Sequence, residues 1–213
     1  MEDITTDVVV IGTGPAGQKA AIQAAKLNKN VVVIEKLPEP GGNCLFSGTI
    51  PSKTLREAII DLTRFHDRSF YSPEVELNKV SIADLNFRLS KVIDDERKMV
   101  HRQFNKNGIR LVQGTARFEN PHTILVMDND YRLVYQIKTD KVILAPGSKP
   151  RNPISVPFDD EVILDSSRLL GIHHVPETML VLGGGIIGSE YASFFSALGC
   201  EVTIIDKRDH ILP

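Results

Sequence analysis

The chain has 213 residues, of which 24% are charged and 42% are hydrophobic, and its formal net charge is −2. These values are typical of a globular protein of one to two domains, and they exclude a disordered chain. With 25 basic and 27 acidic residues, binding to nucleic acid or to an anionic membrane through charge alone is not expected.

Targeting and metal signals are also missing from the sequence. No apolar run reaches the roughly 20 residues that span a bilayer, and the acidic start Met1-Glu2-Asp3 does not resemble a secretory signal. Two cysteines, Cys44 and Cys200, cannot form a disulfide framework or a structural zinc site. The six histidines show no ligand spacing, so no metal site is expected. We therefore expect a reducing, cytoplasmic environment.

The N-terminal segment predicts a βαβ unit. Residues 7–11 form a short β-branched run, typical of a strand buried on both faces. The glycine turn 12–17 follows, then alanines at helical spacing, and then a second buried strand over 31–35. This order of elements predicts a parallel sheet.

The glycine turn of this unit has the spacing of a dinucleotide site. Gly12 would allow the tight turn, Gly14 the approach of a pyrophosphate, and Gly17 the close packing of helix on strand. The diphosphate would lie at the helix N-terminus, beside Pro15 and Ala16. Glu35, at the end of the second strand, could accept hydrogen bonds from a ribose. The alternative is a glycine turn used only for packing.

The middle of the chain predicts a loop followed by two helices. Residues 37–52 are rich in Gly, Pro and Ser, and a helix should then run to about Arg64. A turn is expected at Tyr71-Ser72-Pro73. Ser81 should begin a long helix with Asp84 as capping partner, and Gly108 should end it. The apolar stripe of this helix is Ile82, Leu85, Leu89, Val92, Met99 and Val100, and its charged face, interpreted as solvated, is Arg88, Asp94, Asp95, Arg97 and Lys98.

Short alternating runs then predict strands. Residues 109–137 favour a small antiparallel meander with turns at 120–121 and 128–130. Residues 141–145 form another buried-type strand, closed by Pro146-Gly147-Ser148. Residues 149–158 contain three prolines and are interpreted as a linker.

The C-terminal segment repeats the first unit about 170 residues later. A strand over 179–182 leads into Gly183-Gly184-Gly185-Ile186-Ile187-Gly188, a helix through Leu198, and a strand over 201–206. Two such units imply two dinucleotides, or one dinucleotide and a relic. Asp206 suits the ribose of NAD, whereas Lys207 and Arg208 could pair with the 2′-phosphate of NADP or be solvated charges. Glu190 could face the nicotinamide end of a nucleotide or favour the helix N-terminus.

The segment 41–53, Gly-Gly-Asn-Cys-Leu-Phe-Ser-Gly-Thr-Ile-Pro-Ser-Lys, resembles the two-dinucleotide flavoprotein family of glutathione reductase and dihydrolipoamide dehydrogenase. In that family the first unit binds FAD, and a Cys-x4-Cys segment places a redox disulfide against the flavin. Here Cys44 matches the first cysteine, but Thr49 occupies the second position, and Cys200 lies in the other unit. Disulfide reduction is therefore not expected unless a thiol is supplied from outside.

One branch of this family, the soluble flavin-dependent pyridine nucleotide transhydrogenases, is similar in Gly-Thr-Ile-Pro-Ser-Lys (48–53) and in several further runs: Leu55-Arg56, Tyr71-Ser72, 113–118, His122-Thr123 and 185–193. The resemblance implies a Si-specific enzyme that transfers hydride between NADPH and NAD⁺ through FAD, without a thiol relay. The family continues well beyond this length, so we expect an N-terminal portion that holds FAD weakly by itself and that forms a homo-oligomer as the full-length protein.

The resemblance implies an α/β fold with a doubly wound parallel FAD/NAD(P)-binding sheet, a small antiparallel meander and the start of a second nucleotide unit. Residues 1–148 would be the first segment of an FAD domain, and residues 149–213 a linker and an incomplete NAD(P) domain. Cys44 and Lys53 would lie beside the flavin, with no certain catalytic residue. Further FAD contacts are expected at Glu35, Lys36, Gly41, Gly42, Asn43, Gly48, Thr49, Gly114, Ala116 and Gly147. NAD(P) contacts are expected at Gly183, Gly185, Ile187, Gly188, Glu190, Asp206, Lys207 and Arg208.

Two other functions stay open at this point. One is a dihydrolipoamide-dehydrogenase-like oxidoreductase that lacks its second redox cysteine. The other is a non-catalytic dinucleotide-binding fragment, which would bind FAD, NAD or NADP without reducing a flavin.

Overall fold

The computed structural model describes the backbone of residues 1–66 and 82–212, and the side chains of residues 1–61 and 85–212. The chain forms two compact units, one made of Met1–Phe46 and Ile93–Lys149 and the other of Ser47–Val92 and Pro150–Pro213. The expected turn at 71–73, the helix start at Ser81 with its partner Asp84, and the terminal Pro213 lie outside this description.

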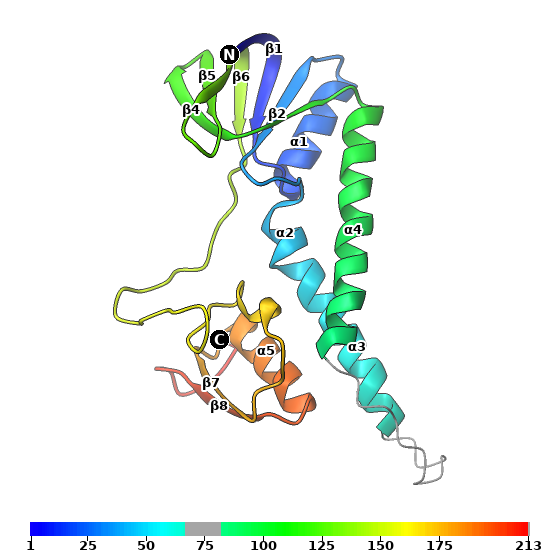
Figure 1. The fold of residues 1–213 in the computed structure, drawn as a ribbon, viewed down its shortest axis with the longest axis vertical. Coiled ribbons are helices and arrows are strands. Elements are labelled where there is room, and N and C mark those ends of the chain that lie inside the picture. Colours follow the sequence, from blue (N-terminus) through cyan, green and yellow to red (C-terminus); the bar gives the residue numbers. More distant parts are fainter. Residues whose placement is uncertain (67–81, 213) are drawn as a thin grey trace. The chain divides into compact units, whose positions relative to one another are not determined.

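The first unit is built around the predicted βαβ element (Figure 1). Strands β1 (Glu2–Ile11) and β2 (Val31–Glu35) pair in parallel, and helix α1 (Pro15–Lys26) connects them. The sheet has six strands in the order β3-β2-β1-β6-β5-β4, completed by β3 (Arg110–Gln113), β4 (Thr115–Asn120), β5 (Thr123–Met127) and β6 (Leu133–Leu144). Strands β3, β2, β1 and β6 are parallel, whereas β6, β5 and β4 are antiparallel.

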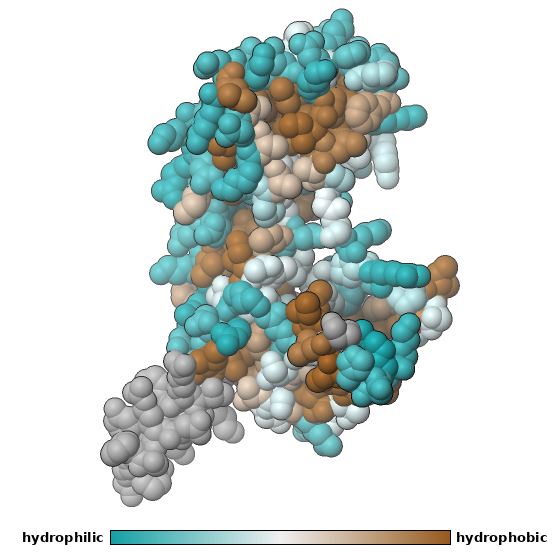
Figure 2. All heavy atoms as spheres, turned by 180° about the vertical axis from the view of Figure 1, so that it is seen from behind, coloured by the Kyte–Doolittle hydropathy of each residue, from teal (hydrophilic) through white to brown (hydrophobic). Residues whose placement is uncertain are grey.

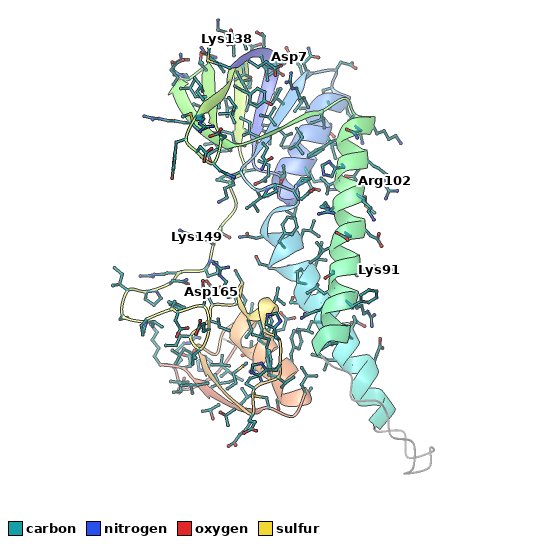
Figure 3. The ribbon with its side chains drawn as sticks, viewed as in Figure 1. Asp7, Lys91, Arg102, Lys138, Lys149 and Asp165 are labelled. Carbon is teal, nitrogen blue, oxygen red and sulfur yellow. The ribbon has the colours of Figure 1, made fainter. Side chains whose placement is uncertain are left out.

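The predicted meander is therefore not separate from the parallel sheet. Its last strand and the predicted strand 141–145 are one strand, β6, which pairs with β1 along its length. The same register holds on both sides of Asp140 and of Asp7, which is labelled in Figure 3, from Thr6 opposite Thr139 to Val8 opposite Lys141. A local pattern could not reveal this continuity, because both halves of β6 have strand-forming sequences and only their shared partner joins them.

The antiparallel strands cover one face of the parallel strands, and helices cover the other. One buried cluster joins meander and parallel residues, namely Ile4, Ile124, Val126 and Ile137 with Val9, Val32, Ile34 and Val112. The other cluster joins the opposite face of β1 and β2 to α1 and to α4 (Ile82–Lys106), through Val8, Val10, Val31, Val33, Ala21, Val100, Phe104 and Ile109. This burial of both faces explains the continuous apolar runs at residues 8–11 of β1 and 31–34 of β2.

The second unit repeats the βαβ element on a smaller scale. Strands β7 (Thr178–Leu182) and β8 (Glu201–Ile205) form a two-stranded parallel sheet connected by α5 (Ile186–Ala197). Its buried core consists of Ile59 from α3 (Thr49–His66), three aromatic residues of α5, and Cys200; the aromatic residues are Tyr191, Phe194 and Phe195. Apolar side chains such as Leu180, Leu182 and Ile205 stay exposed, and Figure 2 shows apolar side chains at the molecular surface.

The segment between β6 and β7, which includes the predicted linker 149–158, has little regular structure. It contains only the 3-10 helix η1 (Leu169–Gly171). Asp165, labelled in Figure 3, orders part of this segment, because its carboxylate accepts hydrogen bonds from Asn152 Nδ2 at 3.0 Å and from the Ser167 N–H at 2.8 Å.

Several local predictions were wrong. Residues 42–46 form helix α2 (Gly42–Phe46), and α3 already begins at Thr49, inside the predicted loop 37–52. Here Leu45 is buried and fixes α2, while Pro51 lies in the first turn of α3, where proline is tolerated. In α4, Leu85 and Val100 are buried but Met99 is 41% exposed, so the apolar stripe is narrower than predicted.

The predicted fold class, an α/β nucleotide-binding fold with a meander and a second unit, is confirmed. The compact units, however, do not follow the expected segments 1–148 and 149–213, since residues 47–92 group with the C-terminal part. The assignment of FAD and NAD(P) to these segments stays a prediction.

Candidate functional site

The first glycine turn has the tight geometry that its sequence predicts. The Gly12 N–H donates to the Ile34 carbonyl at 2.8 Å, and Gly12 has a φ of +103°. A Cβ at Gly12 would lie 2.2 Å from the Ala145 oxygen, and one at Gly17 would lie 1.9 Å from the Gly12 oxygen. Glycine is therefore required at both positions, because any side chain would overlap backbone atoms.

Space is open where a ligand would approach this turn. A Cβ at Gly14 would meet no atom within 4 Å. Gly14 is also the N-cap of α1, no side chain caps the helix, and Pro15 occupies its first turn. A helix N-terminus with free N–H groups and an open approach fits a diphosphate.

Buried hydrogen bonds between Thr13 and Glu35, called the clasp below, hold the turn against the end of β2. Glu35 is 7% exposed and Thr13 is fully buried. Glu35 Oε2 accepts hydrogen bonds from the Thr13 N–H at 3.0 Å and from the Thr13 hydroxyl, and Oε1 accepts one from the Leu37 N–H at 3.0 Å. Glu35 thus has a structural role besides the predicted contact with a ribose, which stays a prediction.

The same hydroxyl connects the glycine-rich loop to the turn. The Gly41 N–H donates to Thr13 Oγ1 at 3.0 Å. A Cβ at Gly42 would lie 2.7 Å from the Gly14 Cα, so the two loops touch through their backbones. The structure therefore brings Gly12, Gly14, Glu35 and the Gly41-Gly42 pair together, and their contacts with FAD stay a prediction.

The second turn has the same hydrogen bonds. The Gly183 N–H donates to the Ile205 carbonyl at 2.8 Å, and Gly183 has a φ of +109°. A Cβ at Gly188 would lie 2.0 Å from the Gly183 oxygen, whereas one at Gly185 would meet no atom within 4 Å. Gly185 is the N-cap of α5 and no side chain caps that helix. A second nucleotide therefore fits this turn by the same criteria.

Asp206 holds the second turn as Glu35 holds the first. Its Oδ2 accepts from the Gly184 N–H at 2.6 Å and from Arg208 Nη2 at 2.8 Å. Its Oδ1 accepts from the Arg208 N–H at 2.9 Å and from Arg208 Nε at 2.8 Å. The side-chain hydrogen bonds from Arg208, followed by those from the backbone N–H groups of Arg208 and Gly184, hold the pKa of Asp206 well below its usual value.

Lys53 and Glu190 form an ion pair within the second unit. Lys53 Nζ on α3 contacts Glu190 Oε1 on α5, and the side chains are 56% and 21% exposed. The sequence predicts separate roles for these residues, Lys53 beside the flavin and Glu190 at the nicotinamide or at the helix start. The structure brings the two together, and both ligand contacts stay predictions.

The remaining predicted positions are distributed over both units. In the first unit, Asn43 of α2 donates to the Ser148 carbonyl, and the Gly114 N–H donates to the Glu35 carbonyl at 2.8 Å. That Gly114 donor is therefore already used, while Ala116 pairs with Val126 in the β4–β5 ladder. Gly48 is partly buried, and the predicted residues in the exposed class are Pro15, Ala16, Lys36, Asn43, Thr49, Lys53, Gly147, Ile187, Lys207 and Arg208.

The two cysteines are both free. Cys44 lies on α2 in the first unit and is partly buried, whereas Cys200 is buried in the core of the second unit. Burial, and then the charge of Glu201, raise the pKa of the Cys200 thiol. Cys200 is thus a packing residue rather than a reactive thiol.

Thr13 is a functional residue that the sequence motif does not single out, because it occupies a variable position of the glycine turn. The available signal is a hydroxyl residue between two glycines, combined with an acid at the end of the second strand. Gln18 and Ser189 are two more such residues, whose side chains donate to the carbonyls of Thr13 at 2.7 Å and of Gly184 at 3.2 Å. These equivalent bonds join each helix to its turn.

Two negative findings apply to the described residues. Among them, no helix is both long and apolar enough to cross a membrane. The described part of the chain also contains no group of three His, Cys, Asp or Glu side chains that could hold a metal ion.

The chain is similar to known proteins over nearly its whole length. It is 45% identical over 207 residues to "Soluble pyridine nucleotide transhydrogenase" of Mycobacterium bovis (strain BCG / Pasteur 1173P2), and 40% identical over 206 residues to the protein of that name from Chromohalobacter salexigens. Each alignment covers 97% of this chain but 44% of the relative. The chain thus spans less than half the length of these curated relatives.

Solved structures share the fold. LpdA from Mycobacterium tuberculosis matches with a TM-score of 0.84 and 27% identity, over 97% of this chain and 46% of LpdA. The HOCl-induced flavoprotein disulfide reductase RclA from Escherichia coli matches with a TM-score of 0.79 and 28% identity, over 97% of this chain and 43% of RclA. The family described as "Pyridine nucleotide-disulphide oxidoreductase" matches residues 6–213. With two glycine turns of equal geometry and this match, the chain belongs to the pyridine nucleotide-disulphide oxidoreductase family.

Proposed function

We propose that the protein is a flavin-dependent oxidoreductase that transfers hydride between NADPH and NAD⁺, on the si face of the nicotinamide. One observation carries the proposal: two glycine turns with equivalent hydrogen bonds and open approaches, combined with Thr49 at the position of a second redox cysteine. Two nucleotide sites fit a reaction between a flavin and a nicotinamide. The name of the relatives with 40–45% identity agrees with this reaction.

The first turn would hold FAD. Gly14 leaves room for the diphosphate at the start of α1, and Glu35 keeps acceptor capacity on Oε1, which receives one hydrogen bond. The Gly41-Gly42 loop against Gly14 would close the same site. When bound, FAD supplies a ring that accepts a hydride from one nicotinamide and returns it to another.

The residues of this chain would bind and orient the two nucleotides. The second turn would bind the dinucleotide of NAD(H) or NADP(H) at Gly185, with Asp206 and Arg208 at its ribose end. The ion pair with Glu190 would hold the ammonium group of Lys53 in a fixed position within the second unit. A cytoplasmic location and a homo-oligomeric full-length protein stay predictions.

Disulfide reduction is disfavoured by the cysteines. Thr49 is exposed at the start of α3 and its hydroxyl cannot form a disulfide with Cys44. Cys200 is buried in the second unit, with a raised thiol pKa. A dihydrolipoamide-dehydrogenase-like reaction would therefore lack its second sulfur.

Hydride transfer from NADPH to thio-NAD⁺ tests the proposal, with the full-length, flavin-loaded protein. We expect turnover without added thiol, transfer of the si-face deuterium of labelled NADPH, and no reduction of lipoamide or glutathione disulfide. Thiol-dependent turnover would favour the dihydrolipoamide-dehydrogenase-like alternative. Binding of FAD, NAD⁺ and NADP⁺ without flavin reduction would show a non-catalytic binding protein instead.

A further inference from the structure

We propose that the Asp206–Arg208 ion pair is a shared gate of the second turn. NAD(H) would use its carboxylate and NADP(H) its guanidinium, and either nucleotide must first separate the two side chains. This inference rests on the proposed function, because it assumes that nicotinamide nucleotides bind at the second turn. It adds how one site can accept both of them.

The carboxylate half has no free acceptor while the pair is closed. A carboxylate offers about four lone-pair positions, and Asp206 receives four hydrogen bonds, three of them from Arg208. A ribose hydroxyl can therefore reach Asp206 only after the guanidinium has moved. Asp206 itself is 8% exposed and is held by the Gly184 N–H, so it is the fixed half of the gate.

The guanidinium half is the one that can move. The Arg208 side chain is 36% exposed. Its Nε and Nη2 donors are committed to Asp206, and this is a pair that can bind a phosphate in bidentate fashion. The N–H groups that remain, two on Nη1 and one on Nη2, could bind a 2′-phosphate only while the Asp206 carboxylate stays on the same guanidinium, and the two like charges repel. A favourable phosphate complex therefore requires Arg208 to leave Asp206.

The first turn has no such gate. Leu37 stands at the position of Arg208, two residues after the acid, and Glu35 receives its hydrogen bonds from Thr13 and Leu37. No cation contributes to these hydrogen bonds. The first turn, without an arginine beside its acid, would thus suit one resident nucleotide. The second turn, with the Asp206–Arg208 pair, would suit two nucleotides that bind in alternation.

The gate would bring the two nicotinamide affinities closer together. Each nucleotide gains contacts with one half of the pair, and each loses the same ion pair when it binds. Two substrates that take turns at one site need comparable affinities, since otherwise the tighter one would exclude the other. Removing either half should therefore shift the two affinities in opposite directions.

Calorimetric titration of the full-length, flavin-loaded protein with NAD⁺ and with NADP⁺ tests this gate. We expect Arg208→Gln to bind NAD⁺ several-fold more tightly and NADP⁺ about tenfold more weakly, the scale of one charge-assisted hydrogen bond. Asp206→Asn should do the reverse. Arg168→Gln is the matched control, because Arg168 also pairs with an aspartate of the second unit, Asp160, at 3.2 Å; it should change neither affinity.

The outcomes separate the gate from the proposed function. If both affinities fall together in both variants, while the flavin spectrum and circular dichroism match the wild type, the pair only supports the turn and the gate is wrong. Unchanged affinities in both variants overturn it too. If the wild-type protein transfers hydride but the opposite shifts are missing, only the gate fails. If the wild-type protein binds neither nucleotide, the proposed function fails with it.

Discussion

The two glycine turns share their internal hydrogen bonds but differ in what surrounds them. In each, the acid that ends or follows the second strand accepts from the N–H of the second turn residue and from the N–H two positions after the acid itself. Around the first turn, however, Ala145, the residue after β6, packs against Gly12, whereas a Cβ at Gly183 would meet no atom within 4 Å. The local motif thus sets the geometry of the turn, and the neighbouring strand sets how closely the turn is packed.

The helices that connect the strands of the two βαβ units also differ in how they pack. Helix α1 packs on its strands mainly through small residues such as Ala21, while α5 uses Tyr191, Phe194 and Phe195. In the first unit two layers bury both faces of β1 and β2. In the second unit Leu180 and Leu182 are 59% and 64% exposed. Aromatic side chains therefore provide much of the core of the smaller unit, where the sheet buries less.

Substitution of the first glycine in each turn should give the largest difference. Gly12→Ala should destabilise by about 4 kcal/mol, because backbone strain and overpacking each cost about 1–3 kcal/mol. Gly183→Ala should cost about 2 kcal/mol, from strain alone. Urea unfolding of both variants measures the two losses. Equal losses would show that Ala145 does not stiffen the first turn.

Thr13 should be the next most sensitive position. Thr13→Val removes the hydroxyl that donates to Glu35 and accepts from the Gly41 N–H, so about 1–3 kcal/mol of stability should be lost, with weaker FAD binding. Thr13→Ser keeps the hydroxyl and is the matched control. Urea unfolding and flavin titration measure both variants, and a serine variant as damaged as the valine variant would argue against the clasp.

The ionisation of Tyr191 should report the burial of aromatic side chains on α5, which α1 lacks. Desolvation, and then the charge of Glu190, raise the pKa of Tyr191 to about 12. Because the folded protein disfavours the phenolate, this contribution to stability is complete below the ordinary pKa of 10.0 and is lost as the pH rises toward 12. Ultraviolet titration should show one tyrosine ionising later than the others, and Tyr191→Phe should remove it. A simple titration near 10.0 would contradict this burial.

Asp206 should give the smallest effect, at acid pH. Its pKa lies below the ordinary 3.8, chiefly through Arg208, so the pair contributes its stability above that value and loses it as the pH falls through the folded pKa. Carboxyl NMR should find Asp206 ionised at a pH where other aspartates are half protonated. In Arg208→Gln its pKa should move back toward 3.8. An unchanged titration would mean that the backbone N–H groups alone hold the charge.

Sequence reasoning succeeded where structure depends on near neighbours. Both βαβ units, the glycines that their turns require, and the end of α4 before Gly108 follow from spacing and residue type. Gly108 indeed has a φ of +65°. These features are local, because strand, turn and helix propensities act over a few residues.

Only the tertiary structure decided the features that depend on distant partners. The glycine-rich segment that contains Leu45 forms helix α2, in which the Leu45 side chain is buried. The two predicted strands form the single strand β6 because β1 pairs with both of them. Lys53 meets Glu190 across 137 residues, and Thr13 gains its role from a strand end and a loop that both come later in the chain. The type of a residue sets which contacts its side chain can make. Its burial, and the partners that distant parts of the chain bring to it, decide which of those contacts it makes.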